Sequence, residues 1–196
     1  MLLASWNLAG RVKRLPEQAD ALLELGADVL CLQELTRSTL PRWLTLLQDA
    51  GYCAIEHGEL PTAGRARALA VLTASRSPLH AVLVDGMPWP ERVLAAHMSD
   101  GTEVLNVHSP ISPKPDLIKV RTHEALHRHL ADHEPGYARI LCGDLNTPRK
   151  EHPDGTVWTF ARDRYGRLRP DRGERWDQAE LALLRGPAKS LLSCGS

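Results

Sequence analysis

The stretch Asp28-Val29-Leu30-Cys31-Leu32-Gln33-Glu34 is an apolar run of strand length that ends in a carboxylate. It lacks the polar alternation of a strand that faces water, and this pattern is typical of a strand buried on both faces. Such a strand needs a covering layer on each side. The stretch therefore predicts a layered fold in which helices and strands share one core.

Outward from this strand, short apolar runs alternate with amphipathic segments. Apolar residues at helical spacing predict helices over residues 15–25, 39–50, 116–132 and 174–185. Apolar runs of strand length predict strands over residues 2–8, 28–33, 52–56, 68–73, 79–84, 92–97, 103–108 and 139–142. Little helix intervenes between residues 52 and 108, which favours antiparallel sheet there, so we expect a mixed α+β domain.

The composition fits one domain with a substantial core, since the chain has 196 residues of which 43% are hydrophobic. Lys and Arg together number 24, as do Asp and Glu, so no global positive field indicates a nucleic-acid partner.

The first residues show neither a signal peptide nor a membrane span, which predicts a cytoplasmic protein. The cysteines are widely spaced without a CxxC pair, which argues against a structural zinc site and a disulfide scaffold.

Polar side chains stand where four of the predicted strands end: Asn7, Glu34, His108, and Asp144 with Asn146. A sheet arrangement that joins these ends gathers two carboxylates, two carboxamides and an imidazole. Mg²⁺ prefers oxygen ligands and is commonly held by one or two carboxylates, which Glu34 and Asp144 supply. With His108 as a hydrogen-bond or proton donor, this set predicts cleavage of a phosphoester.

The motifs around these residues are Ser5-Trp6-Asn7, Leu32-Gln33-Glu34, residues 106–110 and residues 143–146. In this order and spacing they resemble the endonuclease/exonuclease/phosphatase superfamily of magnesium-dependent phosphodiesterases. The resemblance covers residues 1–186 and implies one domain of that type. It implies a two-sheet α/β sandwich with helices on the outer faces and the site at one end.

The resemblance also assigns roles. Glu34 matches the metal-binding glutamate, and Asn7 the asparagine that assists the metal or the phosphate. Asp144 and Asn146 match the pair that positions the nucleophile and binds phosphate, and His108 matches the catalytic histidine of the deoxyribonuclease-like branch rather than the tyrosine of the apurinic-site branch. The implied cofactor is Mg²⁺, with Mn²⁺ as an alternative.

The sequence departs from this superfamily near its end. Members carry a closing Asp-His pair, whereas residues 187–196 form a divergent tail with neither Asp nor His. We therefore expect the closing C-terminal strands to be missing and sheet edges to be uncovered. Two functions stay open: a hydrolase with activity below that of complete relatives, and a catalytically impaired module that binds phosphate and metal.

The substrate expected from the resemblance is a phosphate ester, with DNA or RNA slightly favoured. Arg65 and Arg67 follow Gly64 and are candidate phosphate contacts. The polar stretch 146–175 is expected to be a long loop or a partly ordered insertion rather than core. Its Arg-rich part, residues 160–175, is compatible with phosphate and base contacts or with a plain exposed loop. Glycoside hydrolysis through the two carboxylates ranks lower, because it leaves both asparagines and His108 without a role.

Overall fold

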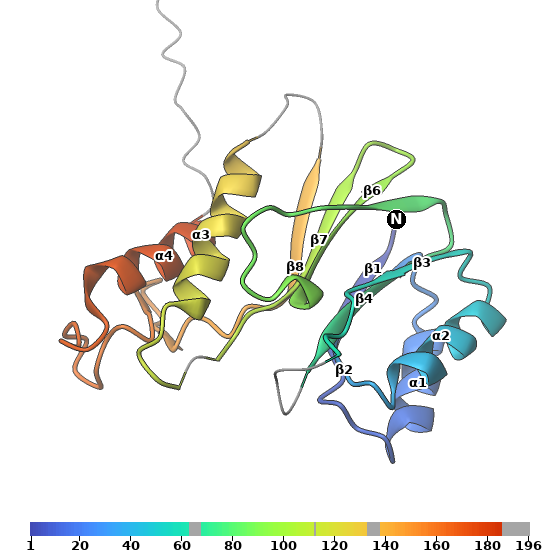
Figure 1. Ribbon diagram of the computed structural model, residues 1–196, viewed down its shortest axis with the longest axis horizontal. Coiled ribbons are helices and arrows are strands. Elements are labelled where there is room, and N and C mark those ends of the chain that lie inside the picture. Colours follow the sequence, from blue (N-terminus) through green and yellow to red (C-terminus); the bar gives the residue numbers. More distant parts are fainter. Residues whose placement is uncertain (63–67, 112, 133–137, 186–196) are drawn as a thin grey trace, which may run out of the picture.

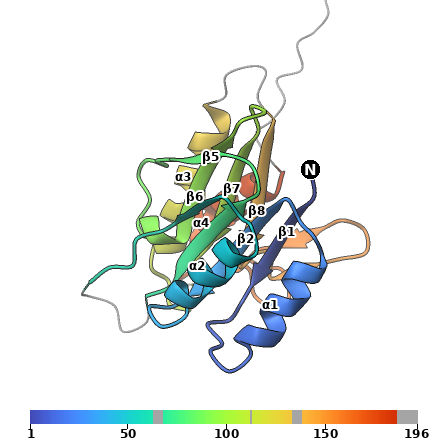
Figure 2. The same ribbon diagram turned by 90° about the vertical axis from the view of Figure 1, so that its right-hand side faces the viewer.

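The computed structural model describes residues 1–62, 68–111, 113–132 and 138–185. Two four-stranded sheets stack face to face, and two helices cover the outer face of each sheet (Figure 1). The view turned by 90° shows the same layers from the side (Figure 2). The predicted two-sheet α+β sandwich with outer helices is confirmed.

The first sheet has the order β1-β2-β4-β3, with β1 parallel to β2 and β4 antiparallel to both of its neighbours. Its strands are β1 (Leu3–Asn7), β2 (Val29–Leu35), β3 (Ala54–His57) and β4 (Ala70–Ser75). Helices α1 (Leu15–Glu24) and α2 (Leu40–Asp49) pack on it through a core that includes Leu22, Trp43 and Leu47. The predicted strand of residues 28–33 is indeed central, with every residue of Val29–Gln33 buried.

The second sheet has the order β5-β6-β7-β8, in which only β7 and β8 are parallel. Its strands are β5 (Leu79–Val82), β6 (Val93–Met98), β7 (Glu103–His108) and β8 (Arg139–Asp144), and a short 3-10 turn, η1 (Pro90–Arg92), precedes β6. Helix α3 (Ile118–Ala131) makes the crossover from β7 to β8, and α4 (Gly173–Arg185) packs beside it. The antiparallel middle of the chain is therefore confirmed.

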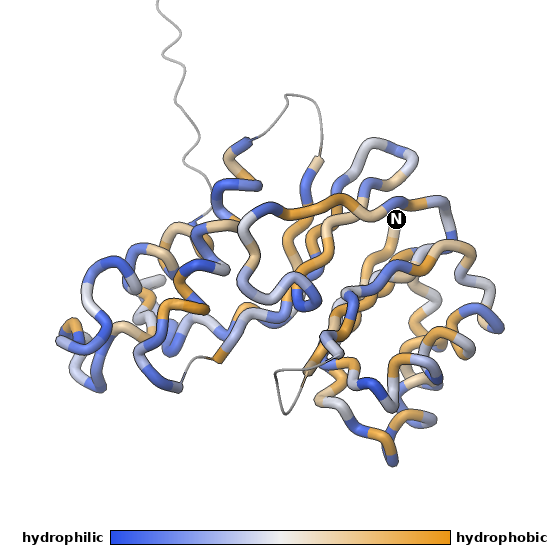
Figure 3. The backbone as a smooth tube through the Cα atoms, in the orientation of Figure 1, coloured by the Kyte–Doolittle hydropathy of each residue, from blue (hydrophilic) through white to orange (hydrophobic). Residues whose placement is uncertain are grey.

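A buried amide pair joins the two sheets. Gln33 Nε2 on β2 donates to Asn106 Oδ1 on β7 at 2.8 Å, and Asn106 Nδ2 donates to the carbonyl oxygen of Leu72 on β4 at 2.9 Å. Most other residues of β2 and β7 are apolar and buried, and orange predominates along the strands of both sheets (Figure 3). Each amide stands one or two residues before a predicted site residue, Glu34 or His108, so these contacts fix the register of both strand ends.

The predicted elements are all present, with ends that differ by at most two residues. The expectation that residues 146–175 lie outside the core was partly wrong. This segment forms a small hairpin, β9 (Lys150–Glu151) with β10 (Val157–Trp158), and then buries Thr159 and Ala161 completely. Ala161 packs with Val120, Trp176 and Ala179 of α3 and α4. The polar composition of the segment did not predict this burial, because only a few of its residues face the core.

Strands β1 and β8 lie at the sheet edges, and within the described residues each has one neighbouring strand. All six residues of β8 are half-buried rather than buried. The absence of closing strands beyond these edges stays a prediction, because residues 186–196 lie outside the part of the chain that the structure describes. Among the described helices, none combines the length and the hydropathy that a membrane crossing requires.

Candidate active site

The two parallel strand pairs bring the predicted site residues to one end of the sandwich. Strands β1 and β2 end at Asn7 and just past Glu34, and β7 and β8 end side by side at His108 and Asp144. Since parallel strands end at the same edge of a sheet, each pair presents two side chains there. The stacking of the two sheets then joins the pairs into one group.

Three of these side chains lie close enough together to hold a metal ion. One ligand atom each from Glu34, His108 and Asp144 lies within 4.8 Å of the others. His108 Nε2 lies 3.6 Å from Glu34 Oε1, and the His108 ring is almost fully buried while Glu34 is partly exposed. Two carboxylates open to solvent beside an imidazole are a donor set that fits Mg²⁺ or Mn²⁺.

Asn7 links the two carboxylates. Its Nδ2 donates to Glu34 Oε1 at 3.1 Å and to Asp144 Oδ2 at 2.7 Å. Its Oδ1 accepts a hydrogen bond from the backbone N–H of Ala9 at 2.9 Å. In this arrangement Asn7 directs its nitrogen, and not its oxygen, toward the predicted metal ligands, and it holds both carboxylates at a fixed separation.

Backbone geometry directs these side chains. Glu34 has a φ of 61° and lies where the register of β2 against β4 shifts between Leu32 and Leu35. A bulge of this kind re-aims the side chain at a strand end. Gly143, directly before Asp144, has a φ of 117°, and a Cβ there would collide with the carbonyl oxygen of Val107 on the neighbouring strand. Only glycine therefore fits this position.

Asn146 completes the loop after β8, with a φ of 48°. Its backbone N–H donates to Asp144 Oδ1 at 3.0 Å, and its Nδ2 donates to the carbonyl oxygen of Ser109 at 2.7 Å. The N–H of Ser109 in turn donates to the carbonyl oxygen of Asp144 at 2.8 Å. The ends of β7 and β8 are thus tied together at the loop that carries two predicted site residues.

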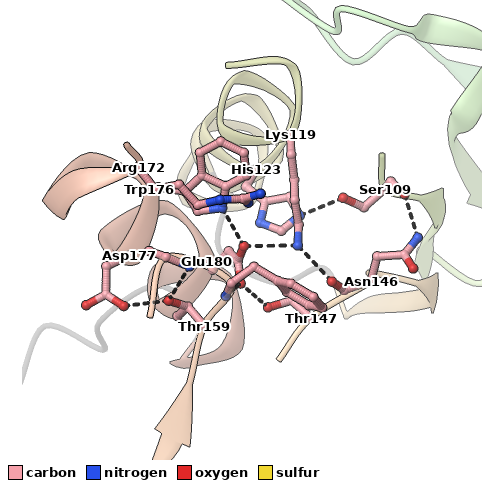
Figure 4. A network of polar contacts seen from close by, with 12 residues as sticks. Ser109, Lys119, His123, Asn146, Thr147, Thr159, Arg172, Trp176, Asp177 and Glu180 are labelled. Atoms are coloured by element: carbon pink, nitrogen blue, oxygen red, sulfur yellow. Dashed lines mark hydrogen bonds and ion pairs between the residues drawn. The ribbon is translucent and has the colours of Figure 1, made fainter. Parts of the chain in front are cut away.

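Behind this loop lies a buried polar network that sequence reasoning missed (Figure 4). Lys119 of α3 and Glu180 of α4 are both fully buried, and Lys119 Nζ donates to the carbonyl oxygen of Asn146. The available signal was positional. Lys119 stands three and four residues before Thr122 and His123, on the helix face that packs inward.

The predicted phosphate contacts Arg65 and Arg67 lie outside the described residues. In the Arg-rich stretch, Arg162 and Leu168 pair across a tight turn, and Tyr165 at its tip is 63% exposed. The Arg164 guanidinium lies 4.7 Å from the Tyr165 ring centroid and that of Arg167 lies 6.0 Å from it. This turn presents an aromatic ring between two cations to solvent.

Comparison with known proteins gives one family. A model of the Endonuclease/Exonuclease/phosphatase family matches residues 4–188. No curated protein matches the chain.

Solved structures of similar fold come from several enzymes. An AP endonuclease from Archaeoglobus fulgidus matches with a TM-score of 0.67 and 22% identity, over 94% of this chain and 70% of that one. NExo, a 3' phosphatase from Neisseria bound to a product DNA hairpin, matches with a TM-score of 0.58 and 27% identity, over 74% of this chain and 58% of that one. ANGEL2, a 2',3'-cyclic phosphatase, matches with a TM-score of 0.53 and 20% identity, over 69% and 44%. The matches at 22% and 20% identity show a shared fold alone. The assignment of His108 to the deoxyribonuclease-like branch, rather than the apurinic-site branch, stays a prediction.

Proposed function

Because the chain belongs to the endonuclease/exonuclease/phosphatase family, we propose that it is a metal-dependent hydrolase of phosphoester bonds, with nucleic acid as the favoured substrate class. The observation that carries this proposal is the convergence of Glu34, His108 and Asp144 at the meeting point of the two sheets. Glycoside hydrolysis fits less well, because it gives no role to His108, which lies in the same group.

Glu34 and Asp144 are the proposed holders of Mg²⁺, with Mn²⁺ as the alternative. When bound, such a cation polarises a phosphoryl oxygen and offsets negative charge in the transition state. Asn7 keeps the two carboxylates in place through its amide nitrogen. Asp144 and Asn146 orient the attacking water and the phosphate.

His108 is the proposed hydrogen-bond or proton donor to the phosphoester. Its ring is 2% exposed, so burial limits its rotation and directs Nε2 toward Glu34. Donation of a proton or hydrogen bond to an oxygen of the ester stabilises the charge that develops there, which contributes on the order of a hundredfold or more in rate.

Nucleic acid is favoured by the Arg–Tyr turn at residues 162–168. Aromatic rings stack on bases and arginines contact phosphates, and together they are typical of single-strand binding surfaces. Arg65 and Arg67 remain proposed phosphate contacts. The similar NExo structure holds a product DNA hairpin, which is in line with this substrate class. We place the proposed activity in one domain, residues 1–186, and in the cytoplasm.

The test is hydrolysis of bis(p-nitrophenyl) phosphate by purified protein with Mg²⁺ or Mn²⁺. We expect turnover that requires metal and that falls by about a hundredfold or more in Glu34→Gln and Asp144→Asn. The control is Asp20→Asn, which removes an exposed carboxylate of α1, outside the group formed by Glu34, His108 and Asp144, and should keep full activity.

Two other outcomes have distinct meanings. Folded protein that binds the metal but gives no turnover above the Asp144→Asn level would support the impaired, phosphate-binding and metal-binding module. Turnover that survives equally in both carboxylate variants would show that another site does the chemistry and would refute the proposal.

A further inference from the structure

The buried charges Lys119 and Glu180 are the least expected feature of the molecule. Each is 0% exposed, and Lys119 Nζ lies 3.0 Å from Glu180 Oε1. Removing two charges from water is costly, and a packed apolar pair of similar size is often at least as stable. Stability alone therefore does not account for an ion pair in this position.

The remaining contacts of Lys119 point to a specific task. Nζ donates to the carbonyl oxygen of Asn146 at 2.7 Å and lies 4.4 Å from the centroid of the Phe160 ring. Asn146 has a left-handed backbone, which asparagine adopts more readily than most residues, so contacts of the loop are needed to select this one conformation. A short charge-assisted hydrogen bond to its carbonyl oxygen supplies such a constraint.

Glu180 lies beside Lys119 and binds the same loop at the next residue (Figure 4). Its Oε2 accepts from Thr147 Oγ1 at 2.6 Å and from the backbone N–H of Phe160 at 3.0 Å, and its Oε1 accepts from Trp176 Nε1 at 2.7 Å. Every oxygen of this carboxylate is therefore used. Burial acts to raise the pKa of Glu180, but Lys119 and the hydrogen bonds from Thr147 and Phe160 together lower it, which is consistent with a carboxylate that stays charged.

A second contact reaches the adjacent strand end. Ser109 Oγ and His123 Nε2 are 2.8 Å apart, and the carbonyl oxygen of Ser109 accepts from Asn146 Nδ2. Helix α3 thus contacts both sides of the joint between β7 and β8, through His123 on one side and Lys119 on the other.

We propose that the Lys119–Glu180 ion pair is a positioning device that holds the Asn146 backbone, and through it the Asp144 carboxylate, in the geometry of the active site. The link to Asp144 is the hydrogen bond from the Asn146 N–H to Asp144 Oδ1. The consequence for catalysis rests on the proposed function, whereas the constraint on the loop does not. The segment between β8 and α4 is then part of the active-site architecture, since it carries Glu180 to this place.

The chain provides a matched control. Arg175 and Glu124 form an exposed ion pair at 2.8 Å between the same two helices, and neither contacts the loop that carries Asn146. The double variant Glu124→Gln/Arg175→Gln therefore removes a tie between α3 and α4 and leaves the positioning contacts in place. It separates general loosening of the helix pair from loss of the proposed device.

The test compares this control with the double variant Lys119→Met/Glu180→Gln, which removes both buried charges together and avoids an unpaired one. Amide hydrogen exchange, resolved by NMR, is measured at Asn146 and Ser109. We expect exchange at both amides to be faster by about tenfold or more in the positioning variant and unchanged in the control. In an active enzyme, kcat falls by about ten- to a hundredfold while KM changes by less than about threefold, because a displaced loop misaligns the reacting groups.

Thr147→Val provides a milder variant in case the double variant does not fold. It removes one link from the loop to Glu180 and leaves the ion pair intact, so we expect a smaller acceleration at the same two amides. Unchanged exchange in both variants, or equal acceleration in the control, would overturn the proposal. If wild-type protein has no hydrolase activity, the exchange result still decides the positioning claim, and the proposed function fails separately.

Discussion

At the scale of single residues, the site is distinguished by backbone conformations that its sequence does not favour. Glu34 and Asn146 are both left-handed, with φ values of 61° and 48°. Asparagine visits this region more readily than most residues, whereas for glutamate the conformation costs about 1 to 3 kcal/mol. Both residues are among those expected to carry the chemistry. The strain is therefore located where the direction of a side chain matters most.

Gly143 provides a test of this local geometry. Gly143→Ala places a Cβ against the carbonyl oxygen of Val107, in addition to the cost of a positive φ. We expect a loss of about 3 kcal/mol or more in the free energy of unfolding, measured by chemical denaturation. Gly155→Ala is the matched control, because Gly155 also has a positive φ but has no atom within 4 Å of the added Cβ. Equal losses in the two variants would show that the contact with Val107 has no importance.

His123 predicts a dependence of stability on pH. Burial lowers the pKa of His123 from 6.5 to about 4. The nearby charge of Lys119 acts in the same direction, and that of Glu180 acts in the opposite direction. Above pH 6.5 the ring is neutral in both the folded and the unfolded state, so its contribution is constant. As the pH falls from 6.5 to 4, only the unfolded state takes up the proton, and the folded state loses about 3 kcal/mol of stability.

The measurement is the free energy of unfolding at pH 7 and pH 4 for wild type and His123→Gln, which keeps a hydrogen-bonding group near Ser109. The variant should lose about 3 kcal/mol less than wild type over this range. The same loss in both proteins would show that His123 does not titrate in this way.

At the scale of elements, the turn at residues 162–168 is built to present its tip. Asp163 Oδ1 accepts the backbone N–H groups of Tyr165 at 2.8 Å and of Arg167 at 3.0 Å. Gly166, with a φ of 80°, packs against the Trp158 ring so closely that a Cβ would not fit. The turn is thus fixed by its own contacts while the ring of Tyr165 stays in solvent. This order holds the ring of Tyr165 in a position where a base could stack on it.

We therefore predict that Tyr165→Ala weakens the binding of single-stranded DNA by about tenfold, because a stacked base contributes about 1 to 3 kcal/mol. The assay is fluorescence anisotropy with a labelled oligonucleotide in the Asp144→Asn background, so that cleavage does not interfere. Tyr165→Phe keeps the ring and should bind as its parent does. Equal affinity of all three proteins would show that DNA does not contact this turn.

At the scale of the whole molecule, the fold was largely predictable because each element has a clear local pattern. The run at residues 28–33 and the helical spacing after residue 116 both gave the observed elements. The candidate site was predictable for a related reason. Its side chains stand at or beside strand ends, and parallel pairing brings the ends within each pair together.

The remaining features depend on contacts between distant residues, which no local pattern contains. Lys119 and Glu180 are separated by 61 positions, and a charged residue in a helix is ordinarily interpreted as exposed. The burial of Thr159 and Ala161 could not be predicted for the same reason, since the polar residues around them predict an exposed loop. Only the packing of α3 against α4 shows why these residues are buried.

The proposed function requires that the two sheets together form one divalent-cation site. Titration of purified protein with Mn²⁺ by isothermal calorimetry tests this claim directly. We predict one ion per chain, with a dissociation constant raised by at least about tenfold in Glu34→Gln and in Asp144→Asn and unchanged in Asp20→Asn. Wild-type binding that is no tighter than that of the folded double variant Glu34→Gln/Asp144→Asn would contradict the account.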